Sequence, residues 1–247
     1  MAASKVALVT GSGKRRVGYH VAEALAERGY KLVIHYHRSA EKAEQTRNHF
    51  QSRGVETLAI GADLTNESAV AAMIQQTLDH FGRLDVLVNC AAVWKRKRLE
   101  EVSADDVRLH FEANTLATFL CCQKAGLAMV AQAEGGCIIT LGDWAEARPY
   151  LDYAAYFPSK GAIPVLTRSL AVELASRNPR VRVNCILPGP VLLPPDLPPA
   201  ERQEAINATL VKREGRPENI AQAVLFFLDN DFVTGVALPV DGGRSIA

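Results

Sequence analysis

Short apolar runs rich in β-branched residues alternate along the chain with longer segments of helical character. Helices are predicted at residues 17–28, 40–53, 68–81 and 104–131, and a further helix carries Tyr156 and Lys160. Strands are predicted at residues 6–9, 31–35, 57–62, 86–89, 137–141, 181–187 and 237–240. Strands that are apolar throughout and alternate with helices indicate a parallel sheet covered on both faces.

The length of the chain, 247 residues, is enough for one large α/β domain with a buried core. The one shift in composition lies at residues 188–199, where six of the twelve residues are prolines. Proline excludes a regular helix or a central strand there. We interpret this stretch as the start of a surface loop in a single domain spanning residues 1–247, because too few residues follow it to form a second domain.

Composition and charge narrow the class of protein. Apolar residues make up 48% of the chain and charged residues 22%, and the net charge of +1 gives no bulk attraction to nucleic acid or to a membrane. The first predicted strand starts too near the N-terminus to leave room for a signal peptide, so we expect a cytoplasmic protein. The five cysteines show no C-x-x-C spacing and are expected to be buried, reduced thiols, and no metal site is predicted.

Candidate chemistry begins with Tyr156 and Lys160, which are four residues apart and share one face of the predicted helix. A Lys ammonium beside a phenol favours the phenolate, so we expect the pKa of Tyr156 to be lowered toward neutrality. A phenol tuned in this way can deliver a proton near pH 7. Neither Tyr150 nor Tyr153 has a lysine four residues later, so Tyr156 is the predicted acid.

This Y-x-x-x-K pair resembles that of the short-chain dehydrogenase/reductases, in which such a tyrosine protonates a substrate while nicotinamide delivers hydride. A Gly-rich turn at residues 10–18, a Pro-Gly turn at residues 188–189 and V-D-G-G at residues 240–243 occur in the family's order. The resemblance therefore spans essentially the whole chain. It implies a single doubly wound Rossmann-type domain with a parallel sheet of about seven strands, assembled as a homotetramer.

The Gly-rich turn, T-G-S-G-K-R-R-V-G, follows the first strand and opens the first helix. Glycines there let the backbone approach a pyrophosphate at a helix N-terminus. The string resembles the T-G-x-x-x-R-x-G variant of pteridine reductases with one residue inserted, which leaves open whether Arg15 or Arg16 faces the phosphate. The residues expected to bind the cofactor here are Gly11, Ser12, Arg15, Arg16 and Val17.

The end of the second strand predicts the type of cofactor. An enzyme that uses NAD places an acid there for the ribose 2′-hydroxyl, whereas this chain has His37, Arg38 and Ser39. Arg38 and Ser39 can bond a 2′-phosphate, so NADPH is the expected cofactor. The string H-Y-H-R-S at residues 35–39 also resembles that of pteridine reductases.

The family resemblance implies further contacts. Asn114 is expected to hold a water in a proton relay to Lys160, and residues 190–213 are expected to form a substrate lid. Asp63 has the alternative of capping a helix N-terminus. The other residues expected at the cofactor are Asp63, Leu64, Asn89, Ala91, Lys160, Pro188, Gly189 and Val191.

Asp143, thirteen residues before Tyr156, stands where most of the family has a serine that donates a hydrogen bond to an oxyanion. An ionised carboxylate has no donor and repels an oxyanion. It suits instead a substrate rich in N–H donors with an imine-like C=N bond, such as an amino-pterin, and it opposes Lys160 so that Tyr156 stays protonated. Pteridine and dihydromonapterin reductases carry Asp at this spacing. The alternative is that Asp143 caps the segment beginning at Trp144.

Trp94 is a second pointer to the substrate, because pteridine reductases place an aromatic residue here to sandwich the pterin against nicotinamide. Such stacking contributes roughly 0.5–1.5 kcal/mol beyond burial. Pro190 is also expected at the substrate. The basic run at residues 95–98 is either a solvated surface or an attractor for an anionic tail such as the glutamate of a folate. Of two prolines in the catalytic helix, Pro158 is expected in its first turn and Pro164 is expected to bend it.

The expected activity is NADPH-dependent reduction of a pterin or dihydropterin, with dihydrofolate as a further candidate substrate. Asp143, Tyr156, Lys160 and Asn114 are the expected catalytic residues, and Trp94, Asp143, Tyr156 and Pro190 the expected substrate contacts. One alternative is a generic carbonyl reductase of the same family, such as a 3-oxoacyl thioester reductase. The other is a non-catalytic NADP-binding protein, against which the intact set of catalytic residues argues.

Overall fold

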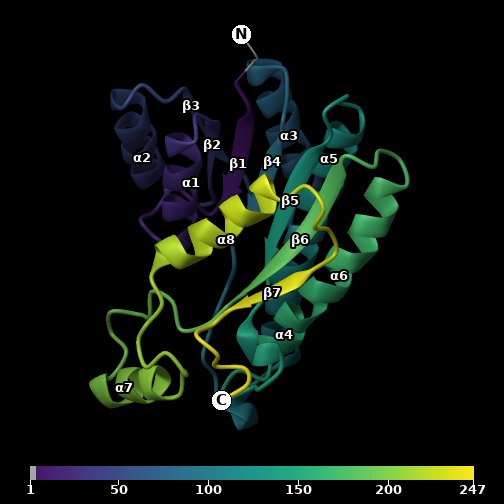
Figure 1. Cartoon of the computed structure of the whole chain (residues 1–247). Coiled ribbons are helices and arrows are strands. Elements are labelled where there is room, and N and C mark those ends of the chain that lie inside the picture. Colours follow the sequence, from purple (N-terminus) through teal and green to yellow (C-terminus); the bar gives the residue numbers. More distant parts are fainter. Residues whose placement is uncertain (1–3) are drawn as a thin grey trace.

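A single sheet of seven parallel strands forms the centre of the computed structural model, which describes residues 4–247 (Figure 1). The strand order is β3-β2-β1-β4-β5-β6-β7, which confirms the predicted doubly wound sheet. The strands are β1 (Val6–Thr10), β2 (Lys31–Tyr36), β3 (Thr57–Gly61), β4 (Val86–Asn89), β5 (Gly136–Leu141), β6 (Val181–Pro188) and β7 (Ala237–Val240).

Helices connect the strands and cover both faces of the sheet. The α-helices are α1 (Val17–Glu27), α2 (Ala40–Ser52), α3 (Glu67–Phe81), α4 (Ala104–His110), α5 (Ala117–Val130), α6 (Phe157–Ala175), α7 (Pro199–Asn207) and α8 (Pro217–Asp229). Shorter helical turns are η1 (Leu99–Glu101), η2 (Phe111–Leu116) and η3 (Trp144–Glu146). Among the helices of residues 4–247, none combines the length and the apolar character that a membrane-spanning segment needs.

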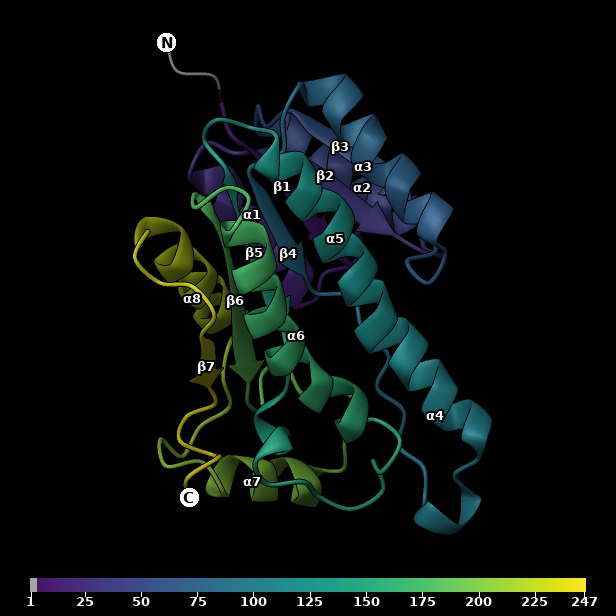
Figure 2. The same ribbon diagram turned by 90° about the vertical axis from the view of Figure 1, so that its right-hand side faces the viewer.

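Two cores form on the two faces of the sheet because successive strand side chains point in opposite directions. Val6 and Leu8 of β1 pack with α3, α5 and α6, while Ala7 and Val9 pack with α1, α2 and α8. Figures 1 and 2 show these two helical layers on either side of the sheet. All five cysteines are free thiols, and all except Cys90 are buried, in line with the expectation from the sequence.

The predicted helix at residues 104–131 is divided by one π-helical turn. A capping box of Ser103 and Asp106 starts α4, because each side chain accepts a hydrogen bond from the other's backbone N–H. The π turn η2 follows and places Asn114 in its middle before α5 begins. Such turns within a helix often occur at functional sites.

Pro158 and Pro164 lie differently in α6. Pro158 occupies the first turn, as predicted, where the missing N–H has no helical partner to lose. Pro164 is buried inside the helix, which nevertheless continues to Ala175. Helices α7 and α8 were missed by the sequence analysis; α8 begins with Pro217 and packs along α1.

The segment expected to form a lid, residues 190–213, stands away from the sheet and carries α7, none of whose residues is buried (Figure 1). Leu192 and Lys212, near its two ends, adopt the left-handed backbone conformation, with φ of 53° and 52°. This conformation is uncommon for residues other than glycine. Glu214, just after this segment, accepts hydrogen bonds from the Leu193 backbone and the Arg202 guanidinium.

Candidate active site

Asp143 and Tyr156 meet beyond the carboxyl end of β5. Asp143 follows β5 and Tyr156 directly precedes α6, and the Tyr156 hydroxyl donates a hydrogen bond of 2.8 Å to Oδ2 of Asp143. The other carboxylate oxygen, Oδ1, accepts a 2.9 Å hydrogen bond from the Ala145 backbone and thereby caps η3. The capping alternative for Asp143 is therefore present through Oδ1, and the contact with Tyr156 is present through Oδ2, while contact of Asp143 with a substrate stays a prediction.

Desolvation by the surrounding protein shifts the pKa values of Asp143 and Tyr156. Asp143 keeps some exposure, but desolvation raises the pKa of its carboxyl group. Tyr156 is buried, and burial together with the charge of Asp143 raises the pKa of its phenol well above the ordinary value. The expectation that Lys160 lowers the pKa of Tyr156 is therefore wrong in direction, because desolvation and the carboxylate dominate.

Lys160 lies buried one turn into α6. Its ammonium group donates a 2.6 Å hydrogen bond to the Leu141 carbonyl at the end of β5. Burial lowers the pKa of Lys160, and the charge of Asp143 acts in the opposite direction. Asp143 and Lys160 thus stabilise one another's charged forms within the same desolvated site.

Asn114 links the loop after β4 to α6. Its Oδ1 accepts from the Val93 backbone at 2.7 Å, and its Nδ2 donates to the Val93 carbonyl and to Oγ of Ser159, both at 3.0 Å. The Asn114 carbonyl accepts the Thr118 hydroxyl at 2.6 Å, and the residue is buried. The structure shows how Asn114 positions these segments, and its role in a proton relay stays a prediction.

An aromatic cluster forms one wall beside Tyr156. The indole of Trp94 stacks on Tyr153 with ring centroids 5.0 Å apart and planes 6° from parallel. Tyr153 contacts Tyr156 and Phe157 in turn. Tyr153 covers one face of the indole, and Trp94 as a whole is 40% exposed, so part of its surface is accessible to a ligand. The sequence analysis singled out Trp94 but missed Tyr153 as its partner.

The basic run at residues 95–98 is largely paired with acids. Arg96 contacts Asp152 at 3.0 Å and Glu201 of the lid helix α7 at 3.2 Å. Lys97 contacts Asp106 at 2.6 Å, and Arg98 lies 3.6 Å from Glu100. These carboxylates offset the positive charge, so the pairing disfavours the idea that the run attracts an anionic tail. A hollow of about 70 Å³ lies beside the run, lined in part by His110 and Tyr153.

The Gly-rich turn has the close backbone packing that a dinucleotide cradle requires. Gly11 has a φ of 65°, and a Cβ atom there would lie 3.0 Å from Cα of Ala91. A Cβ on Gly18 would lie 3.0 Å from the Gly11 carbonyl oxygen and 3.2 Å from Cβ of Cys90. These residues fit a pyrophosphate at the N-terminus of α1, where a helix leaves its first N–H groups without i−4 partners, although the Tyr19 N–H bonds to the Arg16 carbonyl.

The N–H groups of Gly11, Ser12 and Gly13 are bound within the protein. All three donate to His35 of β2, the first to its ring and the other two to its carbonyl. Gly11 and Ser12 therefore shape the turn, while Val17 opens α1. The sequence analysis assigned no role to His35. The feature that could have identified it is that it is a polar residue inside an apolar strand, two positions before His37.

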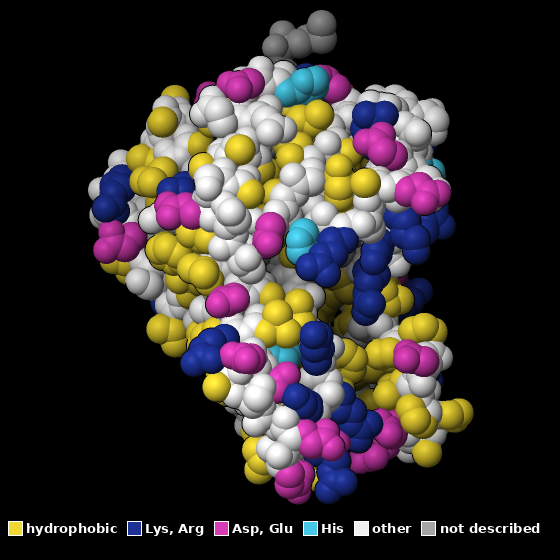
Figure 3. All heavy atoms as spheres, turned by 180° about the vertical axis from the view of Figure 1, so that it is seen from behind, with side chains coloured by type: hydrophobic (Ala, Val, Ile, Leu, Met, Phe, Trp, Pro, Cys, Tyr) yellow, Lys and Arg dark blue, Asp and Glu magenta, His cyan; other side chains and the backbone are white. Residues whose placement is uncertain are grey.

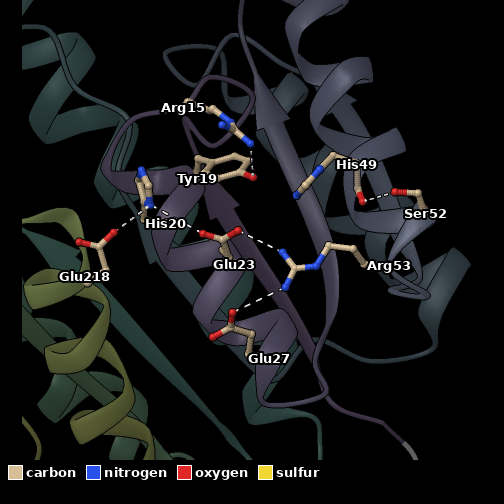
Figure 4. A network of polar contacts seen from close by, with 9 residues as sticks. All are labelled: Arg15, Tyr19, His20, Glu23, Glu27, His49, Ser52, Arg53 and Glu218. Carbon is tan, nitrogen blue, oxygen red and sulfur yellow. Dashed lines mark hydrogen bonds and ion pairs between the residues drawn. The ribbon is translucent and has the colours of Figure 1, made fainter.

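Arg15 and Arg16 take different places in the turn. Arg15 donates a 3.3 Å hydrogen bond to the Tyr19 hydroxyl and lies over the Tyr19 ring, 5.0 Å from its centroid (Figure 4). Arg16 occupies the N-cap position of α1 in an extended conformation. Both side chains are exposed, and which of them contacts a phosphate stays open.

At the ends of β2 and β3, His37 and Arg38 are exposed and Ser39 precedes α2. His37 lies 3.8 Å from Asp63. Asp63 accepts hydrogen bonds from the backbone and hydroxyl of Thr65, which lower its pKa. The cap of α3 is Asn66, so the alternative that Asp63 itself caps this helix is wrong. Seen from behind, Lys and Arg side chains gather along one edge of the molecule, beside a hollow (Figure 3).

At the switch point of the sheet, Asn89 of β4 pairs with Thr10 of β1. The Asn89 side chain donates to Sγ of Cys122 in the core, and the Ala91 backbone donates to the Thr10 hydroxyl at 3.1 Å. Ligands bind at such switch points in doubly wound folds. Leu64, the remaining residue expected near the adenine, is buried at the end of β3.

After β6, Gly189 is required by close packing, because a Cβ atom there would lie 2.4 Å from Cα of Asp241. Pro188 ends β6, and Pro190 and Val191 line a hollow of about 360 Å³ between the lid and the C-terminal segment. Asp143 and Tyr156 do not line this hollow. No cluster of three or more potential metal ligands occurs within residues 4–247.

Residues 12–245 match the sequence family described as Enoyl-(Acyl carrier protein) reductase. The chain is 35% identical to (2S)-[(R)-hydroxy(phenyl)methyl]succinyl-CoA dehydrogenase subunit BbsD of Thauera aromatica, over 98% of this chain and 97% of that protein. It is 34% identical to 3-oxoacyl-[acyl-carrier-protein] reductase FabG of Staphylococcus aureus, over 98% of this chain and 99% of that protein.

Solved structures agree with these sequence matches. A short-chain dehydrogenase/reductase from Serratia marcescens superposes with a TM-score of 0.89 at 32% identity, covering 99% of this chain and all of that chain (100%). A blue fluorescent protein from a metagenomic library, solved in complex with NADPH, superposes with a TM-score of 0.86 at 31% identity, covering 97% of each chain. With its sheet order, its Gly-rich turn and its Tyr156–Lys160 pair, this chain belongs to the short-chain dehydrogenase/reductase family.

Proposed function

We propose that this NAD(P)-dependent oxidoreductase uses NADPH to reduce a C=N bond in a pterin or dihydropterin. The observation that carries the proposal is the 2.8 Å hydrogen bond from Tyr156 to Asp143. A carbonyl reductase would need a donor at the position of Asp143. Here both carboxylate oxygens already accept hydrogen bonds, one from Tyr156 and one from Ala145.

This arrangement suits a nitrogen heterocycle. An acceptor-only carboxylate repels the oxyanion that forms as a ketone is reduced. The amino and ring N–H groups of a pterin are donors, and hydrogen bonds from them to a carboxylate are among the stronger ones in proteins. Asp143 can therefore orient such a ring while leaving the Tyr156 hydroxyl beside it.

Tyr156 is the proposed proton donor. Its raised pKa keeps the proton on the phenol until negative charge develops on a substrate nitrogen. When bound, the nicotinamide supplies the hydride. Lys160 contributes a buried positive charge that offsets Asp143, and its hydrogen bond to Leu141 fixes the direction of its side chain.

The aromatic wall supports a flat substrate. Trp94 stacks on Tyr153 and is 40% exposed, so its accessible surface can pack against a heteroaromatic ring. The preference for NADPH is supported by exposed Arg38 at the end of β2, where an acid that would bind the 2′-hydroxyl is missing from the sequence.

A second candidate is reduction of a 3-oxoacyl thioester or related carbonyl compound. The names of the relatives favour it, because FabG is a 3-oxoacyl reductase and BbsD acts on a succinyl-CoA derivative. The Asp143 carboxylate argues against it on chemical grounds. Initial rates of NADPH oxidation with biopterin, dihydrobiopterin, dihydromonapterin, dihydrofolate and a 3-oxoacyl thioester distinguish the two candidates; absence of turnover with every pterin contradicts the proposal.

We also propose that the chain forms a homotetramer. Apolar side chains are exposed on the outer faces of α5 and α6, among them Leu127, Val165 and Val172, and Phe232 is 97% exposed near the C-terminus. Large apolar side chains left exposed are candidates for burial between subunits. Light scattering of the purified protein should give a mass near four chains, and a monomeric mass contradicts this assembly.

A further inference from the structure

We propose that His35 is a positioning residue that sets the shape of the Gly-rich turn for the dinucleotide. The inference rests on the assignment of a nicotinamide cofactor to this chain. It concerns a residue of β2 that lies behind the turn and that the cofactor itself does not need to touch.

Three consecutive N–H groups of the turn converge on His35. The Gly11 N–H donates to Nδ1 of the imidazole at 3.1 Å, and the N–H groups of Ser12 and Gly13 donate to the His35 carbonyl at 3.2 and 3.3 Å. Because these donors are used internally, and the Tyr19 N–H bonds to the Arg16 carbonyl, a phosphate would rely on other N–H groups near the start of α1, such as those of Val17 and Gly18. One residue thus determines which part of the turn faces the ligand.

The same imidazole also reaches the end of β3. Its Nε2 lies 3.1 Å from the carbonyl oxygen of Ala62, the residue before Asp63. His35 therefore joins the turn beside the pyrophosphate to the strand end expected beside the adenine. His35 is 2% exposed; its hydrogen bond to Ala62 is buried and the one to Gly11 is part-buried, and an unmade bond in such surroundings costs more than at the surface.

Its two partners fix the protonation state of the ring. A backbone N–H can only donate, so Nδ1 must accept from Gly11; a carbonyl can only accept, so Nε2 must donate to Ala62. Only the neutral tautomer with its proton on Nε2 satisfies both. In agreement, burial lowers the pKa of His35 to about 4, so the ring stays neutral at physiological pH.

Two substitutions separate the two bonds. In His35→Asn the amide oxygen lies near the place of Nδ1 and can still accept from Gly11, whereas in His35→Gln the amide nitrogen lies near the place of Nε2 and can still donate to Ala62. His35→Leu removes both interactions. The exposed His80, which pairs with Glu56, provides the matched control as His80→Gln.

The dissociation constant for NADPH, measured by fluorescence titration without substrate, is the main readout. It should rise about tenfold in His35→Leu and His35→Gln, stay within about threefold in His35→Asn, and not change in His80→Gln, while kcat at saturating NADPH changes little. A folded His35→Leu variant with unchanged affinity overturns the inference. Equal losses of NADPH affinity in His35→Asn and His35→Gln also overturn the inference, because they would mean that the packing of the ring, and not its hydrogen bond to Gly11, sets the affinity.

Nitrogen NMR of the wild-type protein labelled at histidine tests the same point without a variant. It should show His35 as the neutral tautomer protonated at Nε2, with a Gly11 amide protected from exchange. A proton on Nδ1, or a freely exchanging Gly11 amide, overturns the inference even if every variant fails to fold. If the wild-type protein itself binds no nicotinamide cofactor, the proposed function fails; if it binds and His35 has no effect, only this inference fails.

Discussion

The Tyr156 hydroxyl and the Asp143 carboxylate share a hydrogen bond at the carboxyl edge of the sheet, in a site that protein atoms shield from water. The proton needed for reduction is therefore stored on the phenol next to a negative charge. This differs from a site in which a cation lowers the pKa of the tyrosine. An acceptor beside the acid, in place of a hydrogen-bond donor, is the basis of the proposed preference for a nitrogen heterocycle.

Replacing Arg38 by alanine should reduce the preference for NADPH. A hydrogen bond to a charged group contributes roughly 1.5–3 kcal/mol, so the ratio of kcat/KM for NADPH to that for NADH should fall roughly 10- to 100-fold. Steady-state kinetics with both cofactors measure this ratio. Arg47→Ala, on the adjacent helix α2, is the control; Arg47 pairs with Glu44, and its loss should leave the ratio unchanged. An unchanged ratio in Arg38→Ala removes the assignment.

Replacing Trp94 by alanine should weaken binding of a flat substrate. Loss of stacking worth roughly 0.5–1.5 kcal/mol raises KM about 2- to 12-fold, while Trp94→Phe should retain part of the effect. Tyr153 also loses its stacking partner in Trp94→Ala, so thermal denaturation should accompany the kinetics. A KM that is the same for all three proteins would show that the substrate does not lie on the indole.

Replacing Arg96 by glutamine should loosen the lid. Arg96 joins the loop after β4 to Asp152 and to Glu201 of α7, whereas Arg98 pairs only locally with Glu100. Because these pairs are exposed, the free energy of unfolding should change by less than about 1 kcal/mol. Limited proteolysis within residues 190–213 should become faster in Arg96→Gln and not in Arg98→Gln. Equal cleavage rates would mean that Arg96 does not hold the lid.

The pH dependence of stability should carry the signature of His35. Its pKa of about 4 in the folded protein lies below the ordinary value of 6.5, so protons favour the unfolded chain. The stabilisation is complete above about pH 6.5 and is lost as pH falls toward 4, by roughly 3 kcal/mol at about 1.4 kcal/mol per pH unit.

Urea unfolding of the wild type and of His35→Gln between pH 4 and 8 tests this, since the variant lacks the titrating ring. The difference in unfolding free energy between the two proteins should change in favour of the variant as pH falls. Burial is the main cause of the low pKa of His35, and the neighbouring His37, which is unchanged in the variant, adds to it. A difference that stays constant with pH contradicts a buried neutral His35.

Much of the fold follows from the sequence because parallel strands buried on both faces leave continuous apolar runs. All seven strands begin and end within one residue of their predicted ends, and the structure brings Asp143 and Tyr156 together. Helix α7 was missed because it begins at the end of the proline-rich stretch, which predicted a loop. The pKa of Tyr156 was predicted in the wrong direction because spacing along a helix contains no information on desolvation.

The other contacts that the sequence did not predict join residues far apart in the chain. Arg96 of the basic run pairs with Asp152 and Glu201, which lie 56 and 105 residues later in the chain, so these pairs could not be predicted from the sequence. The imidazole of His35 hydrogen-bonds to Gly11 and Ala62, and these residues come close to it only when the sheet has formed. Contacts of this kind depend on the tertiary fold, and no local pattern predicts them.

The most direct test of the proposed function compares two substrates in two proteins. The ratio of kcat/KM for a dihydropterin to that for a 3-oxoacyl thioester is measured with NADPH in the wild type and in Asp143→Ser. We predict a ratio well above one in the wild type and a fall of at least about tenfold in the variant, which gains a donor for an oxyanion and loses the carboxylate. A wild-type enzyme that reduces the thioester and no pterin, or a ratio that Asp143→Ser leaves unchanged, contradicts the account.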